Sequence, residues 1–333
     1  MHNIRLNEEY PPADEPADIR KMVALVDALH HPQNDGRVLR AQHAKDTGCV
    51  KALLTVLPGL SPEFCFGVFR EPRTYPVIIR FSNASDSVTS DSSGTPRGMA
   101  IKILQVEGER AIDGDGESSQ DFLLVDSPAF IFSAVKDYTI LFALRQRLRF
   151  DLLAILAYFF IYPSQTLRLI KSSRNKINNS LIRQYWSMSP FRLGPRAVKF
   201  SAKPQDANVS TASQEGAESD FNFLVARLAD SLKANDASFD FMVQFQEDPV
   251  SMPIEDASVE WNESRSPFRK VATIRIPAQD LESPEMVEFR NSCEVLSFNP
   301  WHALADHRPL GGLNRLRRGA YEMSVRRRLQ KPS

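Results

Sequence analysis

The pattern of apolar and polar positions divides this 333-residue chain into strand-like and helix-like segments. Short runs rich in β-branched and aromatic residues, bounded by Gly, Pro, Asn and Asp, are typical of strands. Seven such runs predict strands at residues 49–57, 75–85, 97–106, 120–125, 197–203, 239–246 and 270–278. Their hairpin-like succession favours an antiparallel barrel or sandwich.

Apolar residues at helical spacing predict helices between and around these strands. One helix is expected within 17–31, a second within 221–235 after a polar loop at 203–220, and a third within 311–328. We find no internal repeat and no linker long enough to separate two domains. The sequence therefore predicts an N-terminal arm and helix over 1–36, followed by a single domain over 37–333 with a helical insertion at 139–184.

Composition narrows the classes of partner. With 41 Lys and Arg against 41 Asp and Glu, the chain has no net charge that would attract nucleic acid, so any anion site must be local. The longest apolar stretch, 150–162, is about 13 residues long and contains Asp151, whereas a spanning helix needs about 20. This stretch predicts a helix that is buried or docks on a surface, which leaves a peripheral contact with lipid open.

The three cysteines are Cys49, Cys65 and Cys293. Their odd number, wide separation and lack of a CxxC spacing predict a reducing compartment, with neither a disulfide framework nor a zinc site. The first residues lack the apolar core of a secretory signal. We therefore expect a cytoplasmic protein; whether it forms a homo-oligomer is left open.

The segment 311–328 places six arginines around Tyr321. Arg317 lies four residues before Tyr321 and Arg328 seven after it, so all three share one face of a helix. A tyrosine packed against a guanidinium group is an ordinary structural arrangement, and that interpretation stays open. A functional role requires the phenol, whose usual pKa is about 10, to ionise beside a cation and a metal.

A second group of candidates lies toward the N-terminus. His43 is expected near the start of the first strand with Arg40 three residues before it, and Arg80 and Ser82 share one face of the next strand. A single histidine near a strand is usually structural. These residues, however, occur in order with the motifs DTGCVKA, RFSN, PRGMAIK, QDFLLVDSP, NPWHALADHRPLGGLNR and the final RxxxY.

In these motifs the sequence resembles the catalase superfamily, and within it the small heme-containing, catalase-related branch that lacks a flavodoxin-like extension. The resemblance implies an α+β fold, an antiparallel β-barrel enclosing heme b, with a helical insertion and a C-terminal proximal helix. It also implies roles for eight residues: His43 as the distal histidine, Ser82 as its hydrogen-bond partner, Tyr321 as the axial iron ligand, Arg317 beside that ligand, Arg40, Arg80 and Arg328 at the propionates, and Tyr138 near the heme.

These roles agree with general chemistry. Tyrosinate is a known axial ligand of heme iron, with catalase as the standard example, and a neighbouring arginine offsets its negative charge. A neutral His43 can take a proton from a bound peroxide and return it to the leaving oxygen, while Ser82 fixes the imidazole orientation. For Tyr138, a role as a core residue at a helix start is an equal alternative.

One departure from the family pattern concerns the substrate. Large catalases have an asparagine before the proline of the fourth strand, where this chain has Val125 or Asp126, depending on the alignment. The loss of that amide and the apolar stretch 150–162 favour a peroxidase or isomerase of organic, fatty-acid hydroperoxides. The alternatives are a hydrogen peroxide catalase or peroxidase and a heme-binding protein without turnover.

Overall fold

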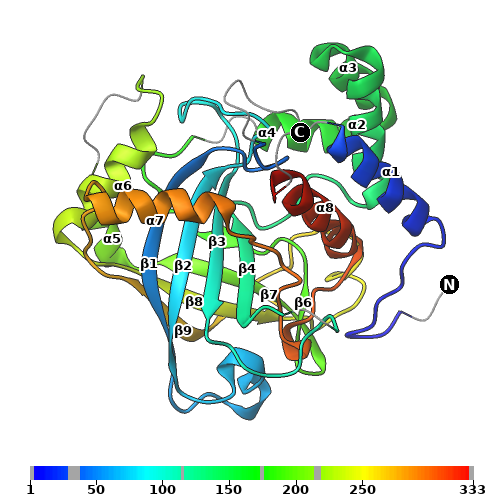
Figure 1. Cartoon of the computed structure of the whole chain (residues 1–333). Coiled ribbons are helices and arrows are strands. Elements are labelled where there is room, and N and C mark those ends of the chain that lie inside the picture. Colours follow the sequence, from blue (N-terminus) through cyan, green and yellow to red (C-terminus); the bar gives the residue numbers. More distant parts are fainter. Residues whose placement is uncertain (1–3, 29–37, 114–115, 173–175, 214–218, 330–333) are drawn as a thin grey trace.

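The computed structural model describes residues 4–28, 38–113, 116–172, 176–213 and 219–329 (Figure 1). Their strands form one antiparallel sheet in the order β5-β4-β3-β2-β1-β9-β8-β7-β6, and a further pairing of β5 with β7 closes it into an eight-stranded barrel. The strands are β1 (Asp46–Val56), β2 (Thr74–Asn83), β3 (Arg97–Leu104), β4 (Ser119–Val125), β5 (Tyr185–Trp186), β6 (Phe191–Leu193), β7 (Arg196–Pro204), β8 (Ala237–Phe245) and β9 (Arg269–Ile276). All seven strands expected from the sequence are confirmed.

The described helices lie outside the barrel. They are α1 (Glu15–Asp27), α2 (Val135–Leu148), α3 (Asp151–Ile161), α4 (Pro163–Ser172), α5 (Asp206–Thr211), α6 (Phe223–Ala234), α7 (Pro284–Val295) and α8 (Gly312–Leu329). Helix α5 falls in the segment 203–220 that was expected to be a loop, so that prediction was wrong in part. None of the helices in the described residues has the length and apolarity needed to cross a bilayer.

The inside of the barrel is filled by its own side chains. Phe122 packs against Phe200 and Phe241, with ring centroids 4.6 and 5.0 Å apart, and all three side chains are fully buried. An eight-stranded barrel has room for little more than such side chains. The structure thus confirms the expected catalase-like barrel, and the space beside the candidate residues lies on the outer face of its sheet. Enclosure of a heme stays a prediction.

Strand register defines that outer face. Phe81, Met99 and Leu124 lie side by side on β2, β3 and β4 and belong to the barrel core. The next row, Ser82, Gly98 and Val125, is also in register, and because side chains alternate along a strand it points to the opposite face. Helices α6 and α7 pack on β1, whereas α1, α2 and α8 contact one another beside the sheet (Figure 1).

The cysteine prediction was wrong in one respect. Cys49 of β1 and Cys293 of α7 form a disulfide, with Cα atoms 6.7 Å apart although 244 positions separate them in the chain. Spacing along the sequence does not reveal this pair, because only the packing of α7 on β1 brings the two residues together. Cys65 remains a free thiol. The boundary expected at residues 36 and 37 lies outside the described residues and stays a prediction.

Candidate functional site

A cavity of about 660 Å³ lies against the outer face of β2, β3 and β4. Residues from α1, α2, α3, α4 and α8 complete its wall. Its lining contains every candidate residue from the sequence except Asp126: Arg40, His43, Arg80, Ser82, Tyr138, Arg317, Tyr321 and Arg328. Residues separated by almost 290 positions in the chain therefore share one cavity, which is large enough for a sizeable ligand.

His43 is held in one orientation by its surroundings. A hydrogen bond of 2.9 Å joins its Nδ1 to the Ser82 hydroxyl, and its backbone has a left-handed φ of 56°. Gly98 lies directly beneath this pair: a Cβ at that position would be 2.7 Å from the imidazole and 2.7 Å from the Ser82 oxygen. The glycine of the RGMAIK motif is thus required for the close approach, a role that sequence reasoning missed.

Burial keeps His43 neutral. Burial, and then the positive charges of Arg80, Arg317 and Arg40, lower the pKa of His43 to about 3. Hydrogen bonding to Ser82 engages Nδ1, which leaves Nε2 for another partner. The imidazole is therefore a neutral base over the physiological pH range, as the expected acid–base role requires.

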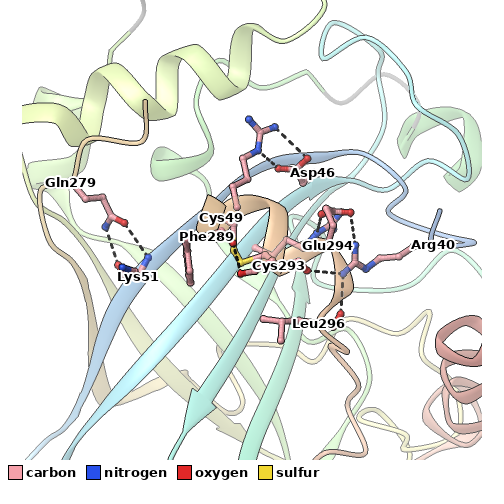
Figure 2. The surroundings of a disulfide bond; sticks show 12 residues. Arg40, Asp46, Cys49, Lys51, Gln279, Phe289, Cys293, Glu294 and Leu296 are labelled. Carbon is pink, nitrogen blue, oxygen red and sulfur yellow. Dashed lines mark hydrogen bonds and ion pairs between the residues drawn. A yellow bond between two sulfur atoms is a disulfide. The ribbon is translucent and has the colours of Figure 1, made fainter. Parts of the chain in front are cut away.

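Arg40 and Arg80 share one carboxylate. Arg40 donates to Oε2 of Glu294 at 2.7 Å (Figure 2). Arg80 donates to Oε1 of the same carboxylate at 2.9 Å. Arg40 also donates to the backbone carbonyls of Cys293 and Leu296. Burial, together with the charge of Arg80, lowers the pKa of Arg40 to about 9, and Glu294 opposes this shift. Sequence reasoning missed Glu294, since it lies far from both arginines in the chain.

Arg328 completes this cationic wall. Its Nη1 donates to the backbone carbonyl of Glu294 at 2.8 Å, whereas its Nε is buried without a hydrogen-bond partner. Three guanidinium groups therefore face one carboxylate, and the disulfide at Cys293 holds the end of α7 that carries it (Figure 2). An excess of buried positive charge favours an anionic ligand here.

Helix α8 contributes a second arginine to the lining. Arg317 donates to the side-chain oxygens of Ser189 and Asn314, at 3.3 and 3.2 Å. Burial lowers the pKa of Arg317, while the phenols of Tyr321 and Tyr138 oppose the shift. Arg317 and Tyr321 thus interact electrostatically, as their spacing of four residues on a helix predicts.

Two other arginines of α8 have structural roles. Arg315 forms ion pairs with Glu9, Glu15 and Glu255, and Arg327 pairs with Asp27 of α1. The NPWHALADHRPLGG motif also positions α8: the Trp301 indole donates to the carbonyl of Asn314 at 2.7 Å. Of the six arginines, Arg317 and Arg328 are the ones that line the cavity.

Tyr138 is a packed residue of α2 and also lines the cavity, while its role beside a heme stays a prediction. It lies in the first turns of α2, stacks on Phe132 with ring centroids 4.7 Å apart, and contacts Phe142 edge to face. It is also part of the cavity wall. Burial raises the pKa of its phenol, so Tyr138 stays protonated.

The structure distinguishes Val125 from Asp126. Val125 lines the cavity and pairs with Gly98, beside His43 and Ser82. Asp126 accepts a hydrogen bond of 2.7 Å from the backbone amide of Arg97 and is not part of the cavity lining formed by the described residues. Because side chains alternate along a strand, only one of these two neighbouring residues can face the cavity, and it is Val125. The position of Asp126 therefore does not support the expectation that it acts in the distal pocket.

The residues present fit a heme. The cavity is bounded by apolar side chains such as Phe142, Met188 and Leu316, it contains a phenol beside a buried arginine, and it has a surplus of guanidinium groups for two carboxylates. The orphaned Nε of Arg328 is one donor that such a carboxylate would satisfy. Tyr321 would ligate the iron, and Arg40, Arg80 and Arg328 would pair with the propionates.

The fold is that of a catalase-like β-barrel protein. No family model and no curated protein matches the sequence. Among solved structures, the chain is similar to a fungal catalase (TM-score 0.65, 15% identity, 88% of this chain and 60% of the other), a bacterial catalase (0.66, 14%, 99% and 64%) and catalase A from Saccharomyces cerevisiae (0.64, 15%, 99% and 68%). These similarities establish a catalase-like fold, and the chain spans about two thirds of the length of those proteins.

Proposed function

We propose that this protein is a heme-dependent enzyme that consumes peroxides, and that organic hydroperoxides are its preferred substrates. One observation carries the proposal: a single cavity brings together a neutral His43 bonded to Ser82, the Arg317 and Tyr321 pair, and the three arginines Arg40, Arg80 and Arg328. When bound, heme supplies the redox-active iron that activates peroxides.

The chain's own residues supply proton transfer and positioning. His43 takes the proton of the peroxide through its free ring nitrogen and returns it to the leaving oxygen, so that water or an alcohol departs instead of an anion. Ser82 keeps the imidazole oriented during both steps. Such a group contributes about 10²- to 10⁴-fold to the rate.

Organic hydroperoxides are favoured by the cavity wall. Val125 is where an amide would orient a small polar peroxide, and Leu123, Phe142, Ile155 and Leu169 add apolar surface. Each methylene buried against such surface contributes about 0.8 kcal/mol, so four methylenes favour a lipid substrate by about 200-fold. A hydrogen peroxide catalase remains the second candidate, because the similar solved structures are named as catalases.

Tyr321→Phe tests the cofactor assignment. The substitution removes the phenol oxygen but leaves the ring, so we expect heme incorporation to be lost or strongly weakened, with Tyr138→Phe as a matched control that retains heme. Absorbance spectra after heme titration report the result. A fully loaded Tyr321→Phe variant with an unchanged spectrum would refute the assignment, and faster turnover of hydrogen peroxide than of a fatty-acid hydroperoxide would favour the second candidate.

A further inference from the structure

Helix α3 presents an apolar surface to the outside. Among its side chains only Ala154 and Tyr158 are buried, and Tyr158 bonds to Gln165 of α4. Phe160 is 85% exposed, and Figure 1 shows α3 at the outer end of the helical insertion, away from the barrel. The exposed apolar side chains, which we call the α3 surface, are Phe150, Leu152, Leu153, Leu156, Phe159, Phe160, Ile161 and Leu167.

Such a cluster is uncommon on a free protein surface. Singly scattered apolar residues are normal, but a contiguous patch marks a site of interaction. The α3 surface is formed by consecutive turns of one helix and the start of the next, so its members are neighbours. The patch therefore requires a partner, and its charge indicates which.

The α3 surface is bordered by positive charge. The segment 145–171 contains five basic residues and one acidic residue, Asp151, in a chain whose total charge is zero. Asp151 is already paired with Arg145 at 2.9 Å. In the part of the chain that the structure describes, Arg147, Arg149 and Lys171 form no ion pair. An apolar helix face with a cationic border complements an anionic lipid surface.

A second copy of the chain fits this surface less well. A two-fold contact would set each α3 surface against itself and bring the two cationic borders together. Nor can the helix span a bilayer, because its 11 residues measure about 16 Å against a hydrocarbon core of about 30 Å. We propose that the α3 surface docks onto anionic lipid membranes, with α3 lying in the plane of the interface.

This docking site adjoins the cavity. Asp151, Ile155 and Leu169, which belong to α3 and α4, also line the cavity, so the same two helices separate it from the proposed membrane surface. An acyl chain could thus reach the site from the bilayer with little exposure to water. The docking itself does not depend on the peroxide chemistry, and it can be tested without it.

Vesicle flotation with the full-length protein tests the proposal, using phosphatidylcholine vesicles with or without phosphatidylserine. We expect binding to the anionic vesicles that weakens with added salt. Phe160→Ser should reduce binding by about 10- to 100-fold, as for loss of one buried aromatic side chain, whereas Val250→Ser, at another exposed apolar residue, should not. Arg147→Gln with Lys171→Gln should reduce it by roughly fivefold per charge, and Lys203→Gln should have no effect.

Two further measurements separate the outcomes. Tryptophan emission of Phe160→Trp should shift to shorter wavelength when anionic vesicles are added, which reports insertion at that residue. The Tyr321→Phe variant should still bind vesicles, so a failure of the heme proposal leaves docking intact. Absence of vesicle binding by the wild-type protein, equal losses in Phe160→Ser and Val250→Ser, or self-association that Phe160→Ser abolishes would each overturn the proposal.

Discussion

Gly98→Ala tests whether the close approach of His43, Ser82 and β3 controls the site. The new methyl group would lie 2.7 Å from the imidazole and from the Ser82 oxygen, whereas ordinary contacts of carbon are about 3.5–4.0 Å. Both side chains must therefore move by about 1 Å, and the hydrogen bond of 2.9 Å is broken. Overpacking of this kind costs typically 1–3 kcal/mol, to which the lost hydrogen bond adds about 1 kcal/mol.

The catalytic effect should be larger than the effect on stability. Misplacing a reacting group by about 1 Å costs about 10²-fold in rate, so we expect the heme-loaded Gly98→Ala variant to cleave peroxide about 100-fold more slowly while it retains heme, because α8 is untouched. Turnover of a fatty-acid hydroperoxide and urea denaturation measure the two effects. Gly116→Ala is the control, since a Cβ there meets nothing within 4 Å.

A double variant makes the test sharper. If Gly98→Ala acts by displacing His43, then adding His43→Ala should cause little further loss, because both changes remove the same proton transfer. Independent, multiplying losses would instead indicate that Gly98 acts elsewhere. Wild-type turnover in Gly98→Ala would refute the reasoning altogether.

Three further predictions follow from contacts around the cavity. Val125→Asn places an amide beside Gly98 and should raise the ratio of kcat/KM for hydrogen peroxide over a fatty-acid hydroperoxide by about 10-fold, the worth of one hydrogen bond, while Asp126→Asn leaves that ratio unchanged. Glu294→Gln removes the charge shared by Arg40 and Arg80. The free energy of unfolding of the apoprotein, measured by urea denaturation, should fall by about 1–2 kcal/mol, because Glu294 is 34% exposed, whereas heme titration should show tighter binding. Losses in both assays would contradict this prediction. The pKa of His43 falls from 6.5 to about 3 on folding, so the unfolded chain takes up the proton at a higher pH than the folded chain does. The free energy of unfolding should therefore fall by up to about 1.4 kcal/mol per pH unit as pH drops from 6.5 toward 3. His43→Asn should reduce that slope, and an identical slope would contradict the assignment.

The barrel was predictable because its strands alternate. In β1, burial alternates along residues 51–56, and the same periodicity defines the other long strands. Helix α7 was missed, since only Met286 and Cys293 are buried along it and its sequence has a weak apolar stripe. Helix and strand periodicity therefore identify elements that bury a full face, but not elements that lie lightly on the surface.

The sequence indicated which residues are candidates for the site, but not which residues they contact. Motifs and helical spacing indicated His43, Ser82 and Tyr321, and the structure places all three in one cavity. Glu294, by contrast, reaches Arg40 across 254 positions, and no local pattern encodes that contact. The choice between Val125 and Asp126 depends on strand register, which a one-residue shift reverses.

The disulfide between Cys49 and Cys293 divides the chain into a covalently closed loop and two tails. Ser82, Gly98 and Arg80 belong to the loop, whereas His43 lies on the N-terminal tail and Tyr321 on the C-terminal tail. The tails bind each other through Arg315 with Glu15 and Arg327 with Asp27. A ligand in the cavity would therefore contact the loop and both tails at once, so its binding would add to the contacts that hold the two tails against the cross-linked barrel.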